Sequence, residues 1–296
     1  MKTPVTVSSE WEVLNEEAMA LYQKGLHEQA VVVATKALGV AEKAVGSHHP
    51  DVGTSLNNLA FLYVTQGQYA QAEPLYKRLL AISEKALGPD HPAVATSLNN
   101  LAALYDTQGQ FALAEPRYKR SLAIWEKALG PDHPDVAMSL NNLAALYDNQ
   151  GQYAQAEPLY KRSLAIREKA LGPDHHNVAI SLNNLAGLYD TQGQHAQAEP
   201  LYRRALAIWE KVLGPDHPDV ATSLNNLASL YNTQGQYVLA EPLYKRALAI
   251  REKALGPDNP AVATSLENMA ALYRKTGRAK EAESLESRAA RIRTIT

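Results

Sequence analysis

The 296-residue sequence contains no cysteine. Disulfides, thiolate metal sites and cysteine nucleophiles are therefore excluded, and the absence fits a reducing compartment. The two signs of charge are nearly balanced, because 29 Lys and Arg residues stand against 31 Asp and Glu residues, a net charge of -2. A nucleic acid or an anionic membrane surface would favour a basic excess, so we expect neither as a partner.

Long apolar runs are also missing. No segment approaches the roughly 20 uninterrupted apolar residues that a membrane-spanning helix needs. The opening residues, MKTPVTVSSEWEVLNEE, place acidic side chains where the apolar run of a signal peptide would lie. We therefore expect a cytoplasmic protein.

Short catalytic motifs are absent from the sequence as well. It contains no phosphate-binding glycine loop, no nucleophile elbow and no HExxH. His91, His133, His175 and His217 recur once per repeat, but successive copies would lie roughly 10 Å apart, too far to share a metal ion at about 2 Å. We interpret them as turn residues and expect no enzyme, metal site or cofactor.

What the sequence does contain is a period of 42 residues. Such self-similarity indicates a repeat architecture and takes precedence over other patterns. LNNLA begins at Leu56, Leu98, Leu140, Leu182 and Leu224, and an altered copy, LENMA, begins at Leu266. LGPD and AEP recur at the same spacing.

Each period predicts two helices. Leu98, Leu101 and Tyr105 lie at i, i+3 and i+7, which is one apolar stripe of a helix. Gly109 interrupts this pattern, and a second stripe follows over residues 111–129. A proline lies about six residues into each second helix of the inner repeats, where it removes a backbone hydrogen bond, so we expect a local bend there.

Tyr105, Gly109, Phe111, Ala114 and Tyr118 have the order and spacing of the tetratricopeptide repeat. The 42-residue unit, with GQYAQAEPLYKRSLAI and EKALGPDHPDVA, closely resembles the kinesin light chain type of this repeat. The resemblance implies an all-α fold: a right-handed superhelical solenoid of about seven helical hairpins with a concave inner wall. Kinesin light chains carry a coiled coil before their repeats, and no sustained heptads precede them here, so we expect a stand-alone array.

We expect one continuous solenoid domain in three parts. Residues 1–46 form a degenerate N-terminal capping hairpin, residues 47–260 form five near-identical hairpins, and residues 261–296 form a C-terminal capping hairpin. Capping units have one uncovered side, so they should differ in sequence. They do, because Leu21 stands in place of the recurring tyrosine and Val32 in place of the proline.

The paired asparagines of LNNLA are unexpected in an apolar helical pattern, because asparagine is a poor helix former. In the family that the sequence resembles, this face of the first helix lines the concave groove. The first column comprises Asn57, Asn99, Asn141, Asn183 and Asn225, and the second comprises Asn58, Asn100, Asn142, Asn184, Asn226 and Asn268. Amides both donate and accept hydrogen bonds, so such a ladder could hold the backbone of an extended peptide.

The sequence leaves open which asparagine column faces a ligand. One column could instead satisfy the backbone of the neighbouring hairpin. We expect the column that begins at Asn57 to lie in the groove.

Specificity should come from residues between the asparagines. Asp106, Asp148 and Asp190 place acid in the middle of the groove, and Phe61 places an aromatic ring near one end. Kinesin light chains prefer tryptophan-containing acidic peptides and use basic groove residues, which this groove lacks in its centre. We therefore expect a ligand segment with basic or neutral side chains, although the aspartates could also be merely solvated.

The leading hypothesis is a non-catalytic protein–protein interaction scaffold that binds an extended peptide or partner segment in the groove. Two alternatives stay open: a self-assembling structural repeat unit, and a regulatory sensor module for a separate effector. We expect a monomer whose protein or peptide ligand is not identified by the sequence, with end-to-end self-association as the alternative.

Overall fold

The computed structural model describes residues 9–295, and over this range it contains fourteen α-helices, one short 3-10 helix and no strand. The chain divides into two compact units, residues 1–150 and residues 151–296. The helices follow one another at two per 42-residue period, as the sequence predicts. The predicted all-α fold of helical hairpins is confirmed.

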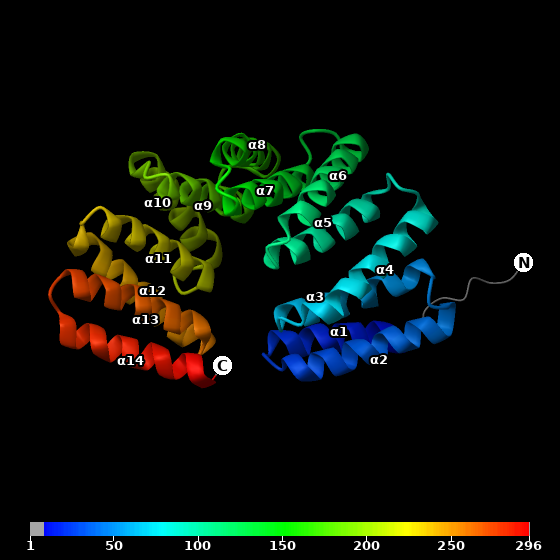
Figure 1. The fold of residues 1–296 in the computed structure, drawn as a ribbon, viewed down its shortest axis with the longest axis horizontal. Helices are drawn as coiled ribbons and strands as arrows, with labels where there is room; N and C mark the ends of the chain where they lie inside the picture. Colours follow the sequence, from blue (N-terminus) through cyan, green and yellow to red (C-terminus); the bar gives the residue numbers. More distant parts are fainter. Residues whose placement is uncertain (1–8, 296) are drawn as a thin grey trace, which may run out of the picture. The chain divides into compact units, whose positions relative to one another are not determined.

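The first unit is built from hairpins that pack on one another in chain order. Its helices are α1 (Ser9–Gln23), α2 (His27–Val45), η1 (Pro50–Val52), α3 (Gly53–Thr65), α4 (Tyr69–Leu87), α5 (Pro92–Thr107), α6 (Phe111–Leu129) and α7 (Pro134–Asn149). α1 pairs with α2, α3 with α4 and α5 with α6, and each second helix also packs against the first helix of the next hairpin (Figure 1).

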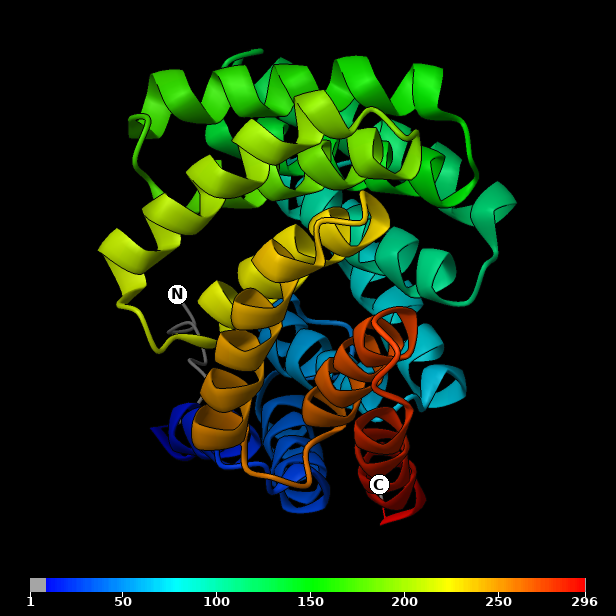
Figure 2. The ribbon, with the colours of Figure 1, turned by 90° about the vertical axis from the view of Figure 1, so that its left-hand side faces the viewer.

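The second unit repeats this arrangement. Its helices are α8 (Tyr153–Leu171), α9 (His176–Thr191), α10 (His195–Leu213), α11 (Pro218–Thr233), α12 (Tyr237–Leu255), α13 (Pro260–Lys275) and α14 (Ala279–Ile295). α9 pairs with α10, α11 with α12 and α13 with α14; the last two pairs are the yellow to red helices of Figure 2. The proposed division of the chain into two capping hairpins and five inner ones stays a prediction.

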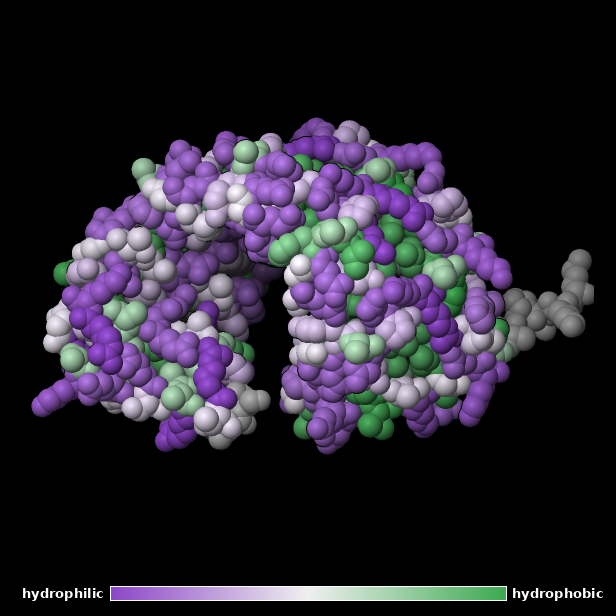
Figure 3. Space-filling view, viewed as in Figure 1, coloured by the Kyte–Doolittle hydropathy of each residue, from purple (hydrophilic) through white to green (hydrophobic). Residues whose placement is uncertain are grey.

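The core of each unit is the stripe of leucine, alanine and tyrosine that the period repeats. Leu98, Leu101, Ala102 and Tyr105 of α5 are all at most 2% exposed. The small alanine permits close helix crossings, and the larger side chains fill the space beside it. In the view of Figure 3 both units are mainly hydrophilic outside, with apolar atoms in seams between the helices of the first unit.

The histidines that the sequence places in turns are N-caps of the first helices. Each lies directly before one first helix: His91 before α5, His133 before α7, His175 before α9 and His217 before α11. The Nδ1 atom of each accepts a hydrogen bond from the backbone N–H two residues on, at 3.1 to 3.2 Å. Asn259 does the same for α13 through its carboxamide oxygen, at 2.9 Å from the nitrogen of Ala261. One orphan donor at each helix start is thereby satisfied.

The second helices end at glycine and continue through their prolines. The turn after α6 places Gly130 at a φ of 86°, a conformation that favours glycine. Pro116 lies inside α6, which extends unbroken from Phe111 to Leu129. The position near the N-terminus limits the cost of the lost hydrogen bond, and the expected local bend stays a prediction.

The cap on α7 gives a prediction with a control that the chain itself supplies. Replacing His133 by alanine should lower the free energy of unfolding by about 1 kcal/mol, because the N–H of Asp135 loses its acceptor. Replacing His133 by asparagine should cost much less, because Asn259 performs this role in α13. Urea unfolding and hydrogen exchange at the Asp135 amide report the difference. Equal exchange rates in both variants would show that the cap does not protect this amide.

Candidate functional site

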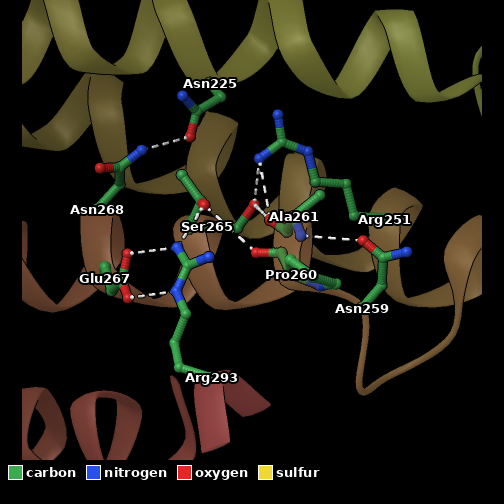
Figure 4. Close-up of polar contacts among 10 residues, drawn as sticks. Asn225, Arg251, Asn259, Pro260, Ala261, Ser265, Glu267, Asn268 and Arg293 are labelled. Carbon is green, nitrogen blue, oxygen red and sulfur yellow. Dashed lines mark hydrogen bonds and ion pairs between the residues drawn. The ribbon is translucent and has the colours of Figure 1, made fainter. Parts of the chain in front are cut away.

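The asparagines lie on the first helices of the hairpins, and their side chains bond one another. In the first unit, Asn58 donates from Nδ2 to Oδ1 of Asn15 at 3.0 Å, Asn100 to Asn57 at 2.8 Å and Asn142 to Asn99 at 2.9 Å. In the second, Asn226 donates to Asn183 at 3.1 Å and Asn268 to Asn225 at 2.9 Å, the latter drawn in Figure 4. Each unit has a surface that carries these amides, and we call it the ladder face of that unit: α1, α3, α5 and α7 in the first unit, and α9, α11 and α13 in the second.

Apart from the bond to Asn15, each of these bonds joins an asparagine of one column to an asparagine of the other. The second asparagine of each of these hairpins donates to the first asparagine of the hairpin before it. The acceptor is a side chain, whereas the structural alternative drawn from the sequence was a backbone group. Asn15 was not singled out from the sequence, because only one asparagine of its pair is present there.

Burial differs between the two columns in α5 and α7. Asn99 and Asn141 of the first column are 8% and 9% exposed, while Asn100 and Asn142 of the second are only partly buried. The second column of α5 and α7 is therefore the more accessible. That the first column faces a ligand stays a prediction.

The three aspartates lie toward the C-terminal ends of α5, α7 and α9 and are partly buried. Burial raises the pKa of Asp106, Asp148 and Asp190 above the ordinary value of an aspartate. Asp106 accepts a hydrogen bond from Nδ2 of Asn149 at 3.4 Å. A carboxylate that has lost part of its hydration gains more from a nearby cation than an exposed one does.

Two of the expected groove residues have neighbours within the fold. The Oδ1 atom of Asp190 lies 3.1 Å from Nδ1 of His195, a distance at which a protonated imidazole and the carboxylate form an ion pair. Phe61 on α3 makes an edge-to-face contact with Tyr22 of α1, with ring centroids 5.1 Å apart. The Phe61 ring is partly buried, so it supports the packing of α3 on α1.

Further polar bonds join successive hairpins at constant separations along the chain. Tyrosine hydroxyls donate to the glutamate of the preceding AEP motif: Tyr105 to Glu73, Tyr147 to Glu115, Tyr189 to Glu157, Tyr231 to Glu199 and Tyr273 to Glu241, at 2.9 to 3.3 Å. Arginines of the second helices pair with a glutamate of the preceding second helix: Arg120 with Glu84, Arg204 with Glu168 and Arg246 with Glu210. The period itself was the available signal, since both partners recur in every inner repeat.

Two buried arginines beside the ladder face were also missed. Arg167 and Arg251 are 7% and 9% exposed and occupy the position that Trp125 and Trp209 hold in other repeats. Arg251 donates to the Ala261 carbonyl oxygen at 3.2 Å and to Oγ of Ser265 at 2.7 Å (Figure 4). Burial lowers the pKa of both guanidinium groups. The alternation of AIWEK with AIREK was the signal in the sequence.

No metal site or membrane span is formed by the part of the chain that the structure describes. Within residues 9–295 there is no group of three or more His, Asp or Glu side chains that could hold a metal ion. None of the helices in this range is long and apolar enough to cross a bilayer.

The asparagine bonds predict an energetic coupling between hairpins. In a double-mutant cycle, the Asn57→Ala and Asn100→Ala changes should couple by about 0.5–1.5 kcal/mol, because each removes the partner of the other. The control is a cycle of Asn57→Ala with Asn142→Ala, whose residues belong to different bonds. Their effects on the free energy of unfolding should simply add. Urea unfolding measures both cycles, and similar coupling in the two would argue against the paired bond.

Comparisons with known proteins agree with the fold of helical hairpins. The tetratricopeptide repeat family model matches residues 12–85, 54–127, 107–169, 149–211, 192–253 and 219–295. No curated protein matches the chain. Among solved structures, BtubC (BKLC) from P. vanneervenii is 28% identical with a TM-score of 0.64, over 78% of this chain and 91% of that one.

Two further structures bear on the fold. A protein of Podosopora anserina, described as a kinesin light chain with nearly identical TPR-like repeats, is 31% identical with a TM-score of 0.58, over 69% of this chain and 96% of that one. The apo form of RapI is 16% identical with a TM-score of 0.69, over 96% and 98% of the two chains, and supports the fold alone. This chain therefore belongs to the tetratricopeptide repeat family and carries the 42-residue repeat of the kinesin light chain-like type.

Proposed function

We propose that this protein is a non-catalytic scaffold that binds an extended segment of a protein partner along the ladder face of a unit. Tetratricopeptide repeats typically mediate protein–protein interaction, and the family assignment supports that class of function. The observation that carries the proposal is the series of side-chain amides at a fixed spacing on successive first helices.

The hydrogen-bonding capacity of an amide exceeds what one ladder bond uses. Each carboxamide has two N–H donors and an oxygen with two lone pairs. The bond from Asn100 to Asn57 takes one donor of the first and one acceptor position of the second. An extended peptide backbone presents donors and acceptors alternately, so amides fixed in this way suit it with little dependence on its sequence.

The aspartates favour a basic segment. Asp106 and Asp148 lie on the same helices as the amides of α5 and α7, and both are partly buried. A lysine or arginine of the ligand beside them would relieve the cost of holding a partly dehydrated carboxylate in its ionised form. The proposed ligand is therefore extended and carries basic side chains where it passes α5 and α7.

A comparison of two matched triple variants tests the role of the amides. The first replaces Asn99, Asn141 and Asn183 by alanine. The control replaces Gln71, Gln155 and Gln197 by alanine, since these are exposed amides at one repeated position of the second helices. Peptide-library selection on the purified wild type supplies the ligands, and calorimetry measures their affinity for all three proteins.

We expect the asparagine variant to lose at least about tenfold in affinity, because several hydrogen bonds of about 1 kcal/mol are removed together. The glutamine variant should bind as the wild type does. Circular dichroism and urea unfolding check that both variants are folded. Equal affinity of the two variants would remove the ladder from the mechanism.

The raised pKa values of the aspartates predict a pH dependence. A basic ligand favours the ionised carboxylates, so its affinity should fall as the pH drops through the raised pKa values of Asp106 and Asp148. Replacing both by asparagine, which stands at this position in α11 as Asn232, should weaken binding at neutral pH and flatten the profile. Affinity measured from pH 7 to pH 4 decides this, and an unchanged profile in the variant would exclude these carboxylates.

A further inference from the structure

One position of the second helices holds a large buried side chain in α6, α8, α10 and α12 and a serine in α4. The large residues are Trp125, Arg167, Trp209 and Arg251, all at most 9% exposed. In α4 the same position is Ser83. A serine is much smaller than an indole or a guanidinium with its stem, so it leaves space that the larger side chains fill elsewhere.

A cavity of about 350 Å³ lies beside Ser83 in the first unit. Its lining includes Thr54 and Asn57 of α3, Leu79 of α4 and Ser97 of α5. Thr54 is exposed and Ser97 is buried, so the cavity extends from the surface toward the core. Because Asn57 belongs to the first asparagine column, the cavity opens at the ladder face of the first unit.

The surroundings of Arg251 show which groups a guanidinium uses at this position. Its Nη1 donates to the carbonyl oxygen of Ala261 at 3.2 Å and to Oγ of Ser265 at 2.7 Å, as Figure 4 shows. Its Nη2 donates to Oγ1 of Thr222 at 3.4 Å. Three uncharged oxygen atoms therefore hold this buried guanidinium.

A serine of the following first helix distinguishes arginine from tryptophan at this position. Arg167 donates from Nη1 to Oγ of Ser181 at 2.9 Å, in the same way as Arg251 donates to its serine. After the two tryptophans the equivalent residues are Ser139 and Ser223, whose buried hydroxyls have no hydrogen-bond partner among the described residues. A guanidinium thus satisfies this hydroxyl, whereas an indole does not.

The cavity of the first unit is lined by the residues that supply the same three acceptors. They are Thr54, Ala93 and Ser97, which stand four 42-residue periods before the three partners of Arg251. Oγ of Ser97 donates to the Ala93 carbonyl oxygen at 2.9 Å, and the equivalent serine beside Arg251 makes the same bond at 3.3 Å. The lone pairs of the Ser97 hydroxyl are therefore left to accept.

We propose that the cavity beside Ser83 is a subsite for an arginine side chain of the bound segment. The guanidinium takes the place that Arg251 takes beside α13 and donates to Thr54, Ala93 and Ser97, while Leu79 contacts the methylene groups of the stem. This inference rests on the proposed function. It gives the basic ligand one preferred residue, placed at the Asn57 end of the ladder face.

Lysine suits the cavity less than arginine does. The described residues that line the cavity are all uncharged, so no carboxylate there replaces the hydration that a cation loses on entry. An ammonium group is more strongly hydrated than a guanidinium and lacks its planar set of donors. The subsite should therefore distinguish the two basic side chains, which the partly buried aspartates do not.

A small probe tests the cavity without a peptide. N-acetyl-arginine methylamide, titrated into the ¹⁵N-labelled full chain, should shift the backbone amide signals of Thr54 and Ser97. The lysine and tryptophan counterparts should bind at least about fivefold more weakly there, because they leave the three acceptors unpaired. Ser83→Arg fills the cavity with a guanidinium of the chain itself, as in α8 and α12, and should abolish the response to the arginine probe.

Two further variants separate the acceptors from the space. Thr54→Val with Ser97→Ala keeps the cavity open but removes two acceptors, so the arginine probe should bind at least about fivefold more weakly. Arg251→Ser should open an equivalent cavity in the second unit, and its signals at Thr222 and Ser265 should gain a response to the arginine probe. Circular dichroism checks each fold, and if Ser83→Arg is unfolded the other two variants decide.

Peptide selection on the wild type separates this inference from the proposed function. An arginine-to-lysine change in a selected peptide should weaken binding to the wild type by about tenfold and have little effect on binding to Ser83→Arg. A selection that yields no peptide would remove the proposed function, while the probe still decides whether the cavity holds a guanidinium. Absent probe shifts at Thr54 and Ser97, an equal response to the lysine or tryptophan probe, or peptides indifferent to Ser83→Arg would each overturn the arginine subsite.

Discussion

One helical hairpin cannot bury both of its apolar sides, so each hairpin of this chain needs a neighbour to cover it. That requirement accounts for the fully buried alanines and leucines of the first helices, which recur in every period. It also fits the recurring asparagine and tyrosine bonds between hairpins, since an interface that repeats needs the same side chains each time. Stability in such an array is a sum of hairpins and of the contacts between neighbours.

Polar bonds give these neighbour contacts their register. Apolar packing has little directionality, whereas the Asn100 to Asn57 and Tyr105 to Glu73 bonds require particular atoms to meet. The partners recur at fixed separations, so a hairpin shifted along its neighbour would lose several bonds together. The low helix propensity of the asparagines is offset by the bonds that they make between hairpins.

The same amides link the packing of the array to its proposed function. A side chain held by one hydrogen bond has fewer orientations, so its remaining donors and acceptors are presented in place. In the proposed function, the partly buried aspartates add a preference for basic side chains to a surface that otherwise binds the ligand through its backbone. Rigid presentation by helices, with sequence preference supplied by a few charged groups, is a general solution for binding extended segments.

The sequence by itself determined the fold class and the period. A 42-residue repeat of two apolar stripes, ended by glycine and proline, admits little but stacked helical hairpins. It also located the asparagine columns and the turn histidines, because residues that recur in every unit occupy equivalent places. The absence of cysteine and of the common catalytic motifs could also be read from the sequence alone.

Tertiary structure decided which atoms meet. The sequence offered two asparagine columns as alternatives, one structural and one for a ligand, but Asn142 of one column bonds Asn99 of the other. The sequence could not show that Arg251 donates a hydrogen bond to Ser265, or that Asn99 is more buried than Asn100. The physical reason is that a repeat fixes spacing along the chain, whereas the offset between neighbouring hairpins depends on how their side chains pack.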